Sequence, residues 1–441
     1  MKFCMITTFF GAHSFGGDAA YVDRLSQALC RRGHEVHVYY CTDAFNAVRG
    51  SHPLRPYSPI PQLHLHPLES RFGILSPLAT QATGQPWFKE SQLRELLDDP
   101  TTDVIHFHNI SLVGGPGVLG LGKNRRAARI MTAHEHWLIC PMHLLWKYDR
   151  KRCDGRNCVT CTLAGGRPPQ IWRATNVIDR GLRHLDALIF PSRHALEEHR
   201  QRGFDAMARL MHVPYFLPDD WCQEVVNEAP AITPTRDGER PYLAAAGRLV
   251  RMKGFQRLIP LMRYLPEVDL KIAGTGPYEP ELRRLADGLS NVKFEGLLGG
   301  DGLARLFRDA RAVVVPSLFP ETFGYVVLEA FAVRTPVIVH QGGGAIQETG
   351  VESGGGLGYH TDDELLLAMR RMVHDVELRD ELAEQGYRKR MTDWSESNHL
   401  DRYFQLIEEF QAARLDPTTH SYRPNFPRLG SPTRHKHPEP R

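Results

Sequence analysis

The sequence predicts an α/β protein made of two doubly wound domains, each with a parallel sheet. Short apolar runs rich in β-branched residues alternate with helical segments of roughly ten residues, which is the pattern of βαβ units. One strand in each half ends in Pro-Ser, at residues 191–192 and 316–317. The length of 441 residues exceeds what one compact domain usually holds, so two or three domains are expected.

Composition limits the classes of function. The chain is 42% hydrophobic and 24% charged, which is ordinary for a globular protein with a large core. Its net charge of +3 is too small to indicate nucleic acid as the main partner. No apolar run approaches the roughly 20 residues of a membrane-spanning helix, and residues 1–13 lack the features of a signal peptide. Eight cysteines without an export signal predict reduced thiols in the cytoplasm.

The first half opens with a βαβ unit, in which residues 2–10 form a strand and residues 19–32 a helix. Gly16 and Gly17 lie in the loop between them, where the lack of side chains lets the backbone approach a phosphate or a sugar. The pair does not match the G-x-G-x-x-G spacing of dinucleotide-binding proteins. Residues 44–100 are expected to be irregular apart from one strand. The further strands expected in this half are 34–40, 63–68, 103–108, 128–132 and 187–190.

Three histidines lie on or after these strands. His134 follows strand 128–132, at the carboxyl end where open α/β sheets place functional groups. It is a candidate site residue, with a hydrogen-bonded structural histidine as the alternative. His106 and His108 share one face of a strand, as the ligands of some metal sites do. With 22 histidines in the chain, packing or lining of a cleft is the interpretation we favour.

Half of the cysteines gather in one stretch that has few apolar residues. Cys140, Cys153, Cys158 and Cys161 have the spacing C-x12-C-x4-C-x2-C. Four thiolates suit tetrahedral zinc, and a small segment without a hydrophobic core needs a cross-link such as a bound metal to stabilise it. We favour a structural zinc site, in which a nearby His136 or His143 is able to replace one thiol. Unligated thiols, a disulfide and an iron–sulfur cluster are the alternatives.

The second half opens with a strand at residues 241–246. The turn that follows carries Arg248 and Lys253, and two cations at the carboxyl end of a strand can neutralise a diphosphate. A pair of surface cations is the alternative. A second glycine-rich turn, Gly274 to Pro277, follows the next strand. The other strands expected here are 268–273, 292–296, 312–315 and 335–340, and the helices are 255–264, 279–289, 303–310, 363–385 and 394–413.

Residues 311–330 are the stretch around which the rest of the chain is organised. After strand 312–315, Gly324 opens an apolar helix at residues 325–333, and such a helix start directs N–H groups and a positive dipole end at an anion. Glu321 and Glu329 flank this start. An anion site framed by carboxylates suits a ligand with both phosphate and hydroxyl groups, such as a nucleotide sugar. Glu329 would hold a ribose diol and Glu321 the sugar hydroxyls, unless both are solvated surface residues.

The motifs G-R-L-x3-K-G, G-x-G-P, P-S-x3-E-T-F-G-Y-x-x-L-E and G-G-G follow one another in this order. Together with the glycine pair and His134, they resemble the retaining glycosyltransferases of the GT-B fold and of family 4, also called glycosyltransferase group 1. The resemblance covers nearly the whole core of the chain. It implies two Rossmann-like domains facing across a cleft, with the Cys-rich insertion at about residues 138–165 of the first.

The resemblance implies domain boundaries and roles for the motif residues. The N-terminal acceptor-side domain would span 1–219, a linker 220–240, the nucleotide-sugar domain 241–391, a helix crossing back 392–415 and a disordered tail 416–441. The implied catalytic residues are His134, near the C6 side of the sugar, Arg248 and Lys253 on the diphosphate, and Glu321 on the sugar. The implied donor-binding residues are Gly16, Gly17, Gly247, Gly274, Gly276, Phe323, Gly324, Tyr325 and Glu329.

The resemblance also implies the chemistry. A retaining transfer would occur without a metal cofactor, in line with the lack of a D-x-D motif at a strand end, and the leaving phosphate would help to deprotonate the acceptor. The donor would be a UDP- or GDP-sugar, and the acceptor a carbohydrate or a lipid-linked molecule of polysaccharide, lipopolysaccharide or glycolipid assembly. Residues 342–348 depart from the family pattern, because a proline is usual before the glutamate and Gln347 precedes Glu348 here.

Two features bear on partners and on rival functions. Residues 123–156 contain nine Lys and Arg against three Asp and Glu, which is either a solvated loop or a patch facing anionic lipid, so peripheral membrane contact at the inner face is an expectation. A nucleotide-sugar epimerase and a non-catalytic sugar-nucleotide-binding protein are the alternative functions. A phosphorylase of glycogen type would need a pyridoxal-binding lysine and a longer chain, and an NAD oxidoreductase lacks its glycine spacing.

Overall fold

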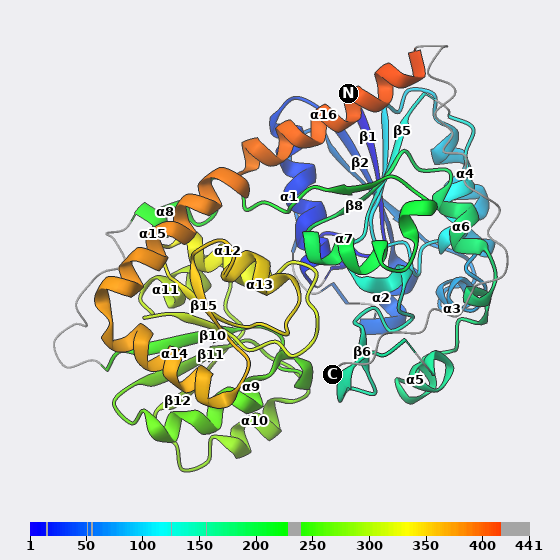
Figure 1. Cartoon of the computed structure of the whole chain (residues 1–441). Helices are drawn as coiled ribbons and strands as arrows, with labels where there is room; N and C mark the ends of the chain where they lie inside the picture. The colour runs from blue at the N-terminus through cyan, green and yellow to red at the C-terminus, as the bar shows by residue number, and fades with distance from the viewer. Residues whose placement is uncertain are drawn as a thin grey trace.

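The protein is described from a computed structural model, which describes residues 1–14, 16–50, 52–53, 56–124, 126–155, 157–227 and 240–415. Two parallel sheets, flanked by helices, make up the two halves of the molecule (Figure 1). This is the mixed α/β architecture that the alternation of strands and helices predicts. The expected tail at 416–441 and most of the expected linker lie outside the described residues.

The first sheet has seven strands in the order β3-β2-β1-β4-β5-β8-β9, and all neighbours are parallel. Strands β4, β5 and β8 are buried along their whole length, as expected where helices cover both faces, whereas β2 and β3 carry exposed polar residues. The register pairs Lys2 with Glu35 and Phe3 with Val104. The strands are β1 (Lys2–Thr7), β2 (Glu35–Cys41), β3 (Leu63–Leu68), β4 (Val104–Phe107), β5 (Ala128–Thr132), β8 (Ala187–Phe190) and β9 (Leu210–His212).

The connections of the first half contain more helix than expected. Residues 44–100 were expected to be irregular, and this prediction is wrong, because three α-helices and a 3-10 turn occupy much of the segment. A small antiparallel hairpin, β6 (Trp146–Lys147) with β7 (Lys151–Arg152), precedes α5. The helices are α1 (Gly17–Arg31), α2 (Thr42–Arg49), α3 (Leu75–Thr83), η1 (Trp87–Lys89), α4 (Glu90–Asp98), η2 (Pro116–Gly120), η3 (His136–Leu138), α5 (Cys158–Ala164), η4 (Ile171–Ala174), α6 (Val177–Leu182), α7 (Arg193–Arg200) and η5 (Phe204–Ala206).

The second sheet has six parallel strands in the order β12-β11-β10-β13-β14-β15. The last strand expected in this half was 335–340, but β15 pairs with it and forms the edge, so the sheet has one strand more than expected. Strand β15 was not predicted because its sequence, Gly-Leu-Gly-Tyr, has little β propensity. The strands are β10 (Tyr242–Ala246), β11 (Asp269–Ala273), β12 (Val292–Gly296), β13 (Val313–Val315), β14 (Val337–His340) and β15 (Gly356–Tyr359).

The helices of the second half lie near the predicted positions, with two differences. The expected helix 255–264 is α9 followed by a 3-10 segment, because Pro260 removes one N–H donor. The expected helix 363–385 is two helices, and Thr361 caps the first of them in a capping box with Glu364. The helices are α8 (Gln223–Asn227), η6 (Arg251–Lys253), α9 (Phe255–Leu258), η7 (Ile259–Tyr264), α10 (Glu279–Leu285), α11 (Gly300–Arg308), α12 (Tyr325–Ala332), α13 (Ala345–Gly350), α14 (Asp362–His374) and α15 (Val376–Asp393).

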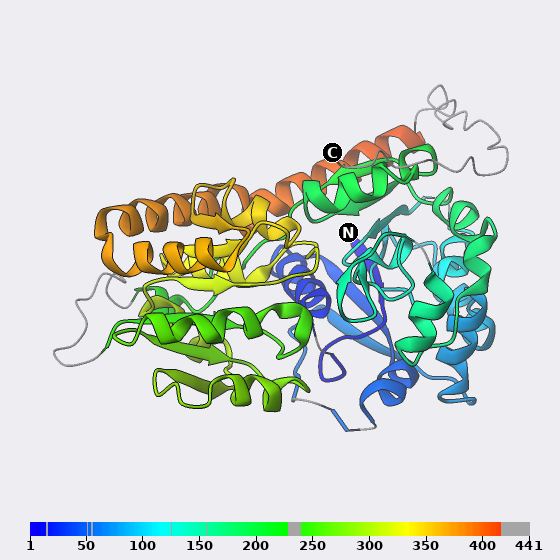
Figure 2. The same ribbon diagram turned by 60° about the horizontal axis from the view of Figure 1, so that its bottom comes forward.

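The last described helix, α16 (Glu396–Leu415), runs from the second half back along the first (Figures 1 and 2). The Tyr403 hydroxyl lies 2.8 Å from Nδ1 of His106, and Arg209 forms an ion pair with Glu409 at 2.8 Å. One apolar cluster includes residues of both sheets, of segment 213–225 and of this helix. The two halves are therefore joined by buried apolar contacts on this side. No described helix has the length and apolarity needed to cross a bilayer.

Candidate active site

The strand order places four loops at one meeting point. In the first sheet the order reverses between β1 and β4, and in the second between β10 and β13. Ligands of open α/β sheets bind at such reversals, outside the carboxyl ends of the strands. The loop with Gly16 and Gly17 follows β1, and the loop with Asn109 follows β4. In the second half, residues 247–254 follow β10 and residues 316–324 follow β13. Most of the predicted site residues lie in these loops.

Glycines let the loops of the second half pack backbone against backbone. Gly274 has φ 132°, and a Cβ there would overlap the carbonyl oxygen of Gly247. Gly254 has φ 79°, and its Cβ would overlap the carbonyl oxygen of Pro316. Both positions therefore need glycine for conformation and for space. The turn that carries Arg248 and Lys253 is fixed by this packing against the loop that carries Glu321.

Lys253 and Glu321 form the polar centre of the second half. The Lys253 ammonium donates to Oε1 of Glu321 at 2.8 Å, and the Ser317 hydroxyl donates to the same oxygen. Glu321 is 9% exposed, and its backbone is held by the N–H of Ala345 and the carbonyl of Gly343. The ion pair holds the Lys253 ammonium and the Glu321 carboxylate in fixed positions. Both groups are then placed to bind a polar ligand.

The start of α12 faces the first half. Gly324 is left-handed at φ 98°, and no side chain caps the helix. Tyr325 stacks on Tyr215 with ring centroids 5.3 Å apart, and Phe323 packs on the same ring at 4.8 Å. Gly17 lies opposite Tyr325, since a Cβ at Gly17 would be 3.6 Å from that ring. The glycine loop of the first half and the helix start of the second are therefore in direct apposition.

Glu329 has a partner that the sequence did not indicate. Nη2 of Arg24 lies 3.3 Å from Oε1 of Glu329, and both side chains are largely buried. The Arg24 guanidinium also lies 4.3 Å from the ring centroid of Tyr325, a cation–π contact. Arg24 belongs to α1, so the carboxylate expected to hold a ribose is paired with a cation from the opposite half.

Arg248 lies apart from this polar centre. Most of its side chain is exposed, and the partial loss of solvent on its covered side, together with the nearby positive charge of Arg49, lowers the pKa of Arg248. Arg49 ends α2 of the first half, so two cations face each other across the two halves. Like charges held near each other favour an anion between them. The structure thus places Arg248 near the site, but no described contact joins it to Lys253.

The side chain of His134 lies in a buried network. Its Nδ1 is hydrogen-bonded to the Tyr215 hydroxyl, and its Nε2 lies 2.9 Å from Nδ1 of His108. Burial lowers the pKa of His134 to about 3, so the ring is neutral at pH 7. Its carbonyl accepts from the Thr322 hydroxyl at 2.6 Å across the two halves. In this structure His134 joins the halves through its backbone, and its ring is hydrogen-bonded within the first half; its role at the transfer centre stays a prediction.

A second polar group lies at the carboxyl ends of β1, β4 and β5, and the sequence did not single it out. The Asn109 amide donates to Asp18 at 3.2 Å and to Glu135 at 3.1 Å, and Glu135 also pairs with His143. Burial and the charge of Glu135 raise the pKa of Asp18 to about 6. Asp18 directly follows Gly16 and Gly17, and this position next to a predicted binding loop could have identified it as a candidate site residue. Two carboxylates here can accept hydrogen bonds from hydroxyl groups.

Glu348, the residue of the atypical loop, contacts the first half. Its two carboxylate oxygens accept from the backbone N–H groups of Arg193 and His194 at 3.2 and 3.1 Å. These amides begin α7, where a negative charge is stabilised by the helix dipole. The Nε2 of His136 also lies 3.1 Å from the carbonyl of Pro320. Contacts on both sides of the site therefore hold the two halves together.

The four clustered cysteines lie on three segments that pack together. The Tyr148 hydroxyl lies 2.7 Å from Oγ1 of Thr160, which joins the β6–β7 hairpin to α5, and the Cys153 sulfur accepts the Gly155 N–H at 3.3 Å. All four thiols are free. Among the described residues, however, only Glu35, His37 and His64 bring three metal-ligating atoms within 4.8 Å of one another. Zinc at the cysteines therefore stays a prediction.

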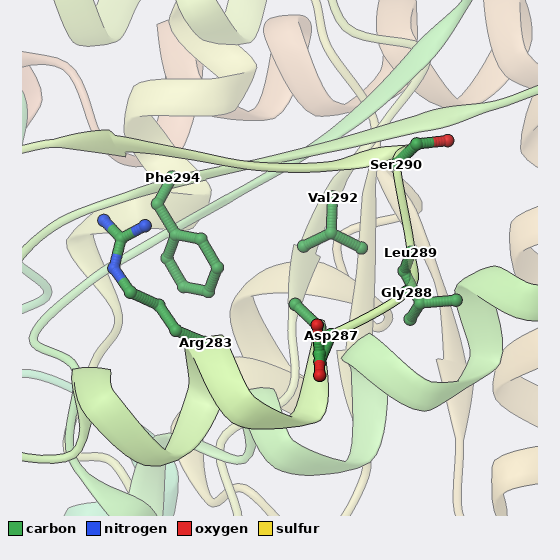
Figure 3. Close-up of a pocket in the computed structure, with 8 residues that line it drawn as sticks. Arg283, Asp287, Gly288, Leu289, Ser290, Val292 and Phe294 are labelled. Carbon is green, nitrogen blue, oxygen red and sulfur yellow. The ribbon is translucent and has the colours of Figure 1, made fainter.

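Two hollows differ in their relation to this site. A small one is lined by His108, Asn109, His134 and Glu135, at the acidic group of the first half. The other, shown in Figure 3, lies between α10 and the start of β12, where Arg283 lies over the ring of Phe294 at 4.5 Å. It is at the amino end of its strand and contains none of the predicted site residues.

Comparison with known proteins agrees with this geometry. Residues 16–215 match the model of the glycosyl transferase 4-like domain, and residues 232–389 match that of the glycosyl transferases group 1. The chain belongs to the group 1 glycosyltransferases, of the family-4-like type. The boundary between the two matches falls between the two sheets. The resemblance drawn from the motifs is confirmed.

The chain has relatives of known name. One is a D-inositol 3-phosphate glycosyltransferase of Xylanimonas cellulosilytica, which is 27% identical over 76% of this chain and 77% of the relative. The sulfoquinovosyl transferase of Arabidopsis thaliana is 32% identical over 32% of this chain and 28% of its own length. A lipopolysaccharide core glycosyltransferase of Rhizobium meliloti is 31% identical over 41% and 53%. The matches to the last two span about half of the relative or less.

Solved structures confirm the fold of this group 1 glycosyltransferase. The sucrose-phosphate synthase of Thermosynechococcus elongatus superposes with a TM-score of 0.67 at 20% identity, over 93% of this chain and 99% of that one. Anabaena HepE in complex with UDP superposes with a TM-score of 0.62 at 15% identity, over 93% and 100%. The two Rossmann-like domains predicted from the sequence are therefore present as a GT-B fold.

Proposed function

We propose that the protein is a retaining glycosyltransferase that moves a sugar from a nucleoside-diphosphate donor to a hydroxyl acceptor in glycolipid or polysaccharide assembly. The observation that carries the proposal is the Lys253–Glu321 pair, held at 2.8 Å in the loops that precede α12, a helix whose start has no side-chain cap and lies opposite the glycine loop of the first half. A cation, a carboxylate and the amides of a helix start without a side-chain cap together match a phosphate joined to a sugar.

The donor would bind mainly to the second half. Lys253, Arg248 and the amides at Gly324 would hold the diphosphate, Glu321 the sugar hydroxyls, and Glu329 the ribose diol. A UDP- or GDP-sugar is the proposed donor, and solved relatives of this fold contain UDP or UDP-glucose. Catalysis would need no metal, because Lys253 and Arg248 supply the positive charge that the leaving diphosphate requires.

The acceptor would bind to the first half. Asp18 and Glu135 would accept hydrogen bonds from acceptor hydroxyls, and Asn109 keeps the two carboxylates in place. A lipid-linked acceptor is proposed, since a curated relative builds lipopolysaccharide core and another is a sulfoquinovosyl transferase.

The reaction would proceed on one face of the sugar. The bond between the anomeric carbon and the diphosphate oxygen breaks, and the electron pair leaves with the diphosphate. The acceptor oxygen then bonds to the anomeric carbon on the same face, and its proton passes to the departing phosphate oxygen. Lys253 and the helix amides meet the negative charge as it grows, in a site from which water is largely excluded.

The first experiment is a thermal-shift panel of UDP-, GDP-, ADP- and dTDP-sugars. A ligand that binds only the folded protein raises the melting temperature, by an amount that grows with its concentration above Kd. One nucleotide class should stabilise the protein, and Lys253→Ala should reduce that shift, whereas the surface variant Arg263→Ala should not. No shift with any nucleotide sugar would count against the proposal. Sugar inversion in the absence of an acceptor would instead favour an epimerase.

A further inference from the structure

Three residues at one edge of the first sheet bring metal-ligating atoms together. Glu35 and His37 lie on β2 and His64 lies on β3, and the atoms that each can offer to a metal all lie within 4.8 Å of one another. Strand β3 is at the edge of the sheet, and the register pairs His37 with His64. Residues two apart in a strand share a face, so all three side chains project from the same face of the sheet.

The distances within this group fit a shared ion. Oε1 of Glu35 lies 2.8 Å from Nε2 of His37 and 3.8 Å from Nε2 of His64. Two ligand atoms that each lie about 2.1 Å from one zinc ion are about 3.4 Å apart in a tetrahedral site, and the two distances lie on either side of this value. The contact of 3.8 Å is too long for a hydrogen bond, so hydrogen bonding with Glu35 does not account for the position of His64.

A fourth residue orients one of the three side chains. Nε2 of His66 lies 2.9 Å from Nδ1 of His37, so the two ring nitrogens of His37 have different partners. A histidine that binds a metal usually donates from its second ring nitrogen to a neighbour, which fixes the orientation of the ring. Burial and the nearby charges of His37 and His64 lower the pKa of His66, so this ring is neutral at pH 7 and can accept that bond.

Charge and exposure also favour a cation here. The hydrogen bond with His37 is the main cause that lowers the pKa of Glu35, so the carboxylate is ionised at pH 7. Within the described residues, both ion-pair partners of Glu35 are histidines. The rings of His37 and His64 stack with centroids 4.7 Å apart, which disfavours a proton on both, and the neutral ring is the form that binds metal. The side chains of Glu35 and His64 are each 49% exposed, so water can complete the coordination.

We propose that Glu35, His37 and His64 bind a zinc ion that links the edge strand β3 to β2. Imidazole and carboxylate ligands suit zinc, whereas calcium and magnesium prefer oxygen ligands. Glu35 begins β2 and His64 is the second residue of β3, so the site lies at the amino ends of these strands. The loops of the candidate active site follow the carboxyl ends. The ion therefore stabilises the sheet and takes no part in glycosyl transfer, and the inference does not depend on the proposed function.

The test is zinc binding to the full chain after treatment with a chelator, measured by calorimetric titration and by the melting temperature. Zinc should raise the melting temperature of the wild type, because a ligand that binds only the folded state stabilises it. His64→Gln should bind one zinc fewer per chain, and His66→Gln should weaken binding at this site by about 10–100-fold. The control is His374→Gln, since His374 lies 3.7 Å from Glu267 but belongs to no group of three ligands among the described residues. This variant should bind zinc like the wild type.

Three results would overturn the inference. The first is wild-type protein that neither binds added zinc nor melts at a higher temperature in its presence. The second is equal zinc binding by His64→Gln and the wild type, and a loss of that binding in Cys158→Ser would then place the ion at the clustered cysteines. The third is a lower melting temperature of His64→Gln that is the same with and without zinc, because this result would make His64 a structural histidine. Without zinc, the two proteins should melt alike.

Discussion

Arg24 of α1 and Glu329 of α12 form an ion pair of 3.3 Å that joins the two halves of the molecule. The pair is largely buried, and the ring of Tyr325 covers the guanidinium. Glu329 is also the residue proposed to hold the ribose of the donor. The same carboxylate therefore joins the two halves in this structure and, under the proposed function, would bind the ribose of the donor.

Arg24→Gln should lower the melting temperature and increase the stabilisation that a nucleotide gives. The substitution leaves a largely buried carboxylate without its cation, and the ribose hydroxyls of a bound nucleotide replace part of the lost interaction. The measurement is the melting temperature with and without saturating UDP or GDP. Arg31→Gln, which removes a more exposed ion pair of the same helix with Glu396, is the control. Equal nucleotide shifts in wild type and Arg24→Gln would contradict the expectation.

Lys253→Ala should reduce turnover by about 10²–10³ at saturating donor, by analogy with the loss of one oxyanion-hole donor. The ammonium meets the charge of the departing diphosphate, so kcat should fall more than donor affinity. Arg257→Ala removes a cation four residues along the chain that pairs with Asp362, and it should leave kcat within about twofold. Near-normal turnover of Lys253→Ala would exclude the proposed role.

Asp18→Asn should stabilise the protein at pH 8 and have little effect near pH 4. The pKa of Asp18 is raised to about 6 in the folded state, so the folded protein keeps this proton at pH values where the unfolded chain has lost it. The stability that this group contributes is complete below about pH 4 and is lost as the pH rises through 6. Since Asp18 is only half-buried, we expect a difference of about 1–2 kcal/mol in the free energy of unfolding, measured with denaturant at both pH values. A pH-independent difference would contradict the assignment.

The buried histidines predict the opposite pH dependence. His399 donates to the Pro214 carbonyl at 2.7 Å and lies 3.2 Å from the Tyr21 hydroxyl, and burial lowers its pKa to about 4. Stability from such a group is complete above about pH 6.5 and is lost as the pH falls toward 4. His399→Gln should therefore show a smaller loss of melting temperature between pH 7 and 5 than wild type. The exposed His374→Gln is the control.

Purified protein should contain about one zinc per chain if the cysteines form the predicted site. Cys158→Ser should then lose most of the metal and lower the melting temperature, whereas Cys30→Ser should retain it. The measurements are elemental analysis and thermal unfolding with and without a chelator. Metal-free protein in which all eight thiols react with a thiol reagent after unfolding would leave the cysteines unligated.

The sequence predicted those elements whose formation depends on a local pattern of residues. Most strands of the two sheets are buried apolar runs, so they could be recognised from the sequence. Lys253 approaches Glu321 because two strand ends of one sheet meet there. Helix α3 was missed because its apolar residues face solvent and its polar ones face inward, so its periodicity did not resemble that of a core helix. β15 was missed because two of its four residues are glycine.

The contacts between the halves were not predictable from one sequence. Arg24 and Glu329 are 305 residues apart, and nothing in the sequence around Arg24 marks it as the partner of Glu329. The family resemblance implies that His134 lies near the transfer centre, but the sequence did not indicate that the Tyr215 hydroxyl and the His108 ring would hold its ring in a buried network. The Arg24–Glu329 contact depends on how the two domains dock, which no spacing of residues encodes.

A crystal structure of the protein with bound UDP or GDP tests the central claim most directly. The account predicts the diphosphate beside Lys253 and the first turn of α12, with the ribose hydroxyls on Glu329 and Arg24 displaced from that carboxylate. A nucleotide bound away from both Lys253 and Glu329 would contradict it.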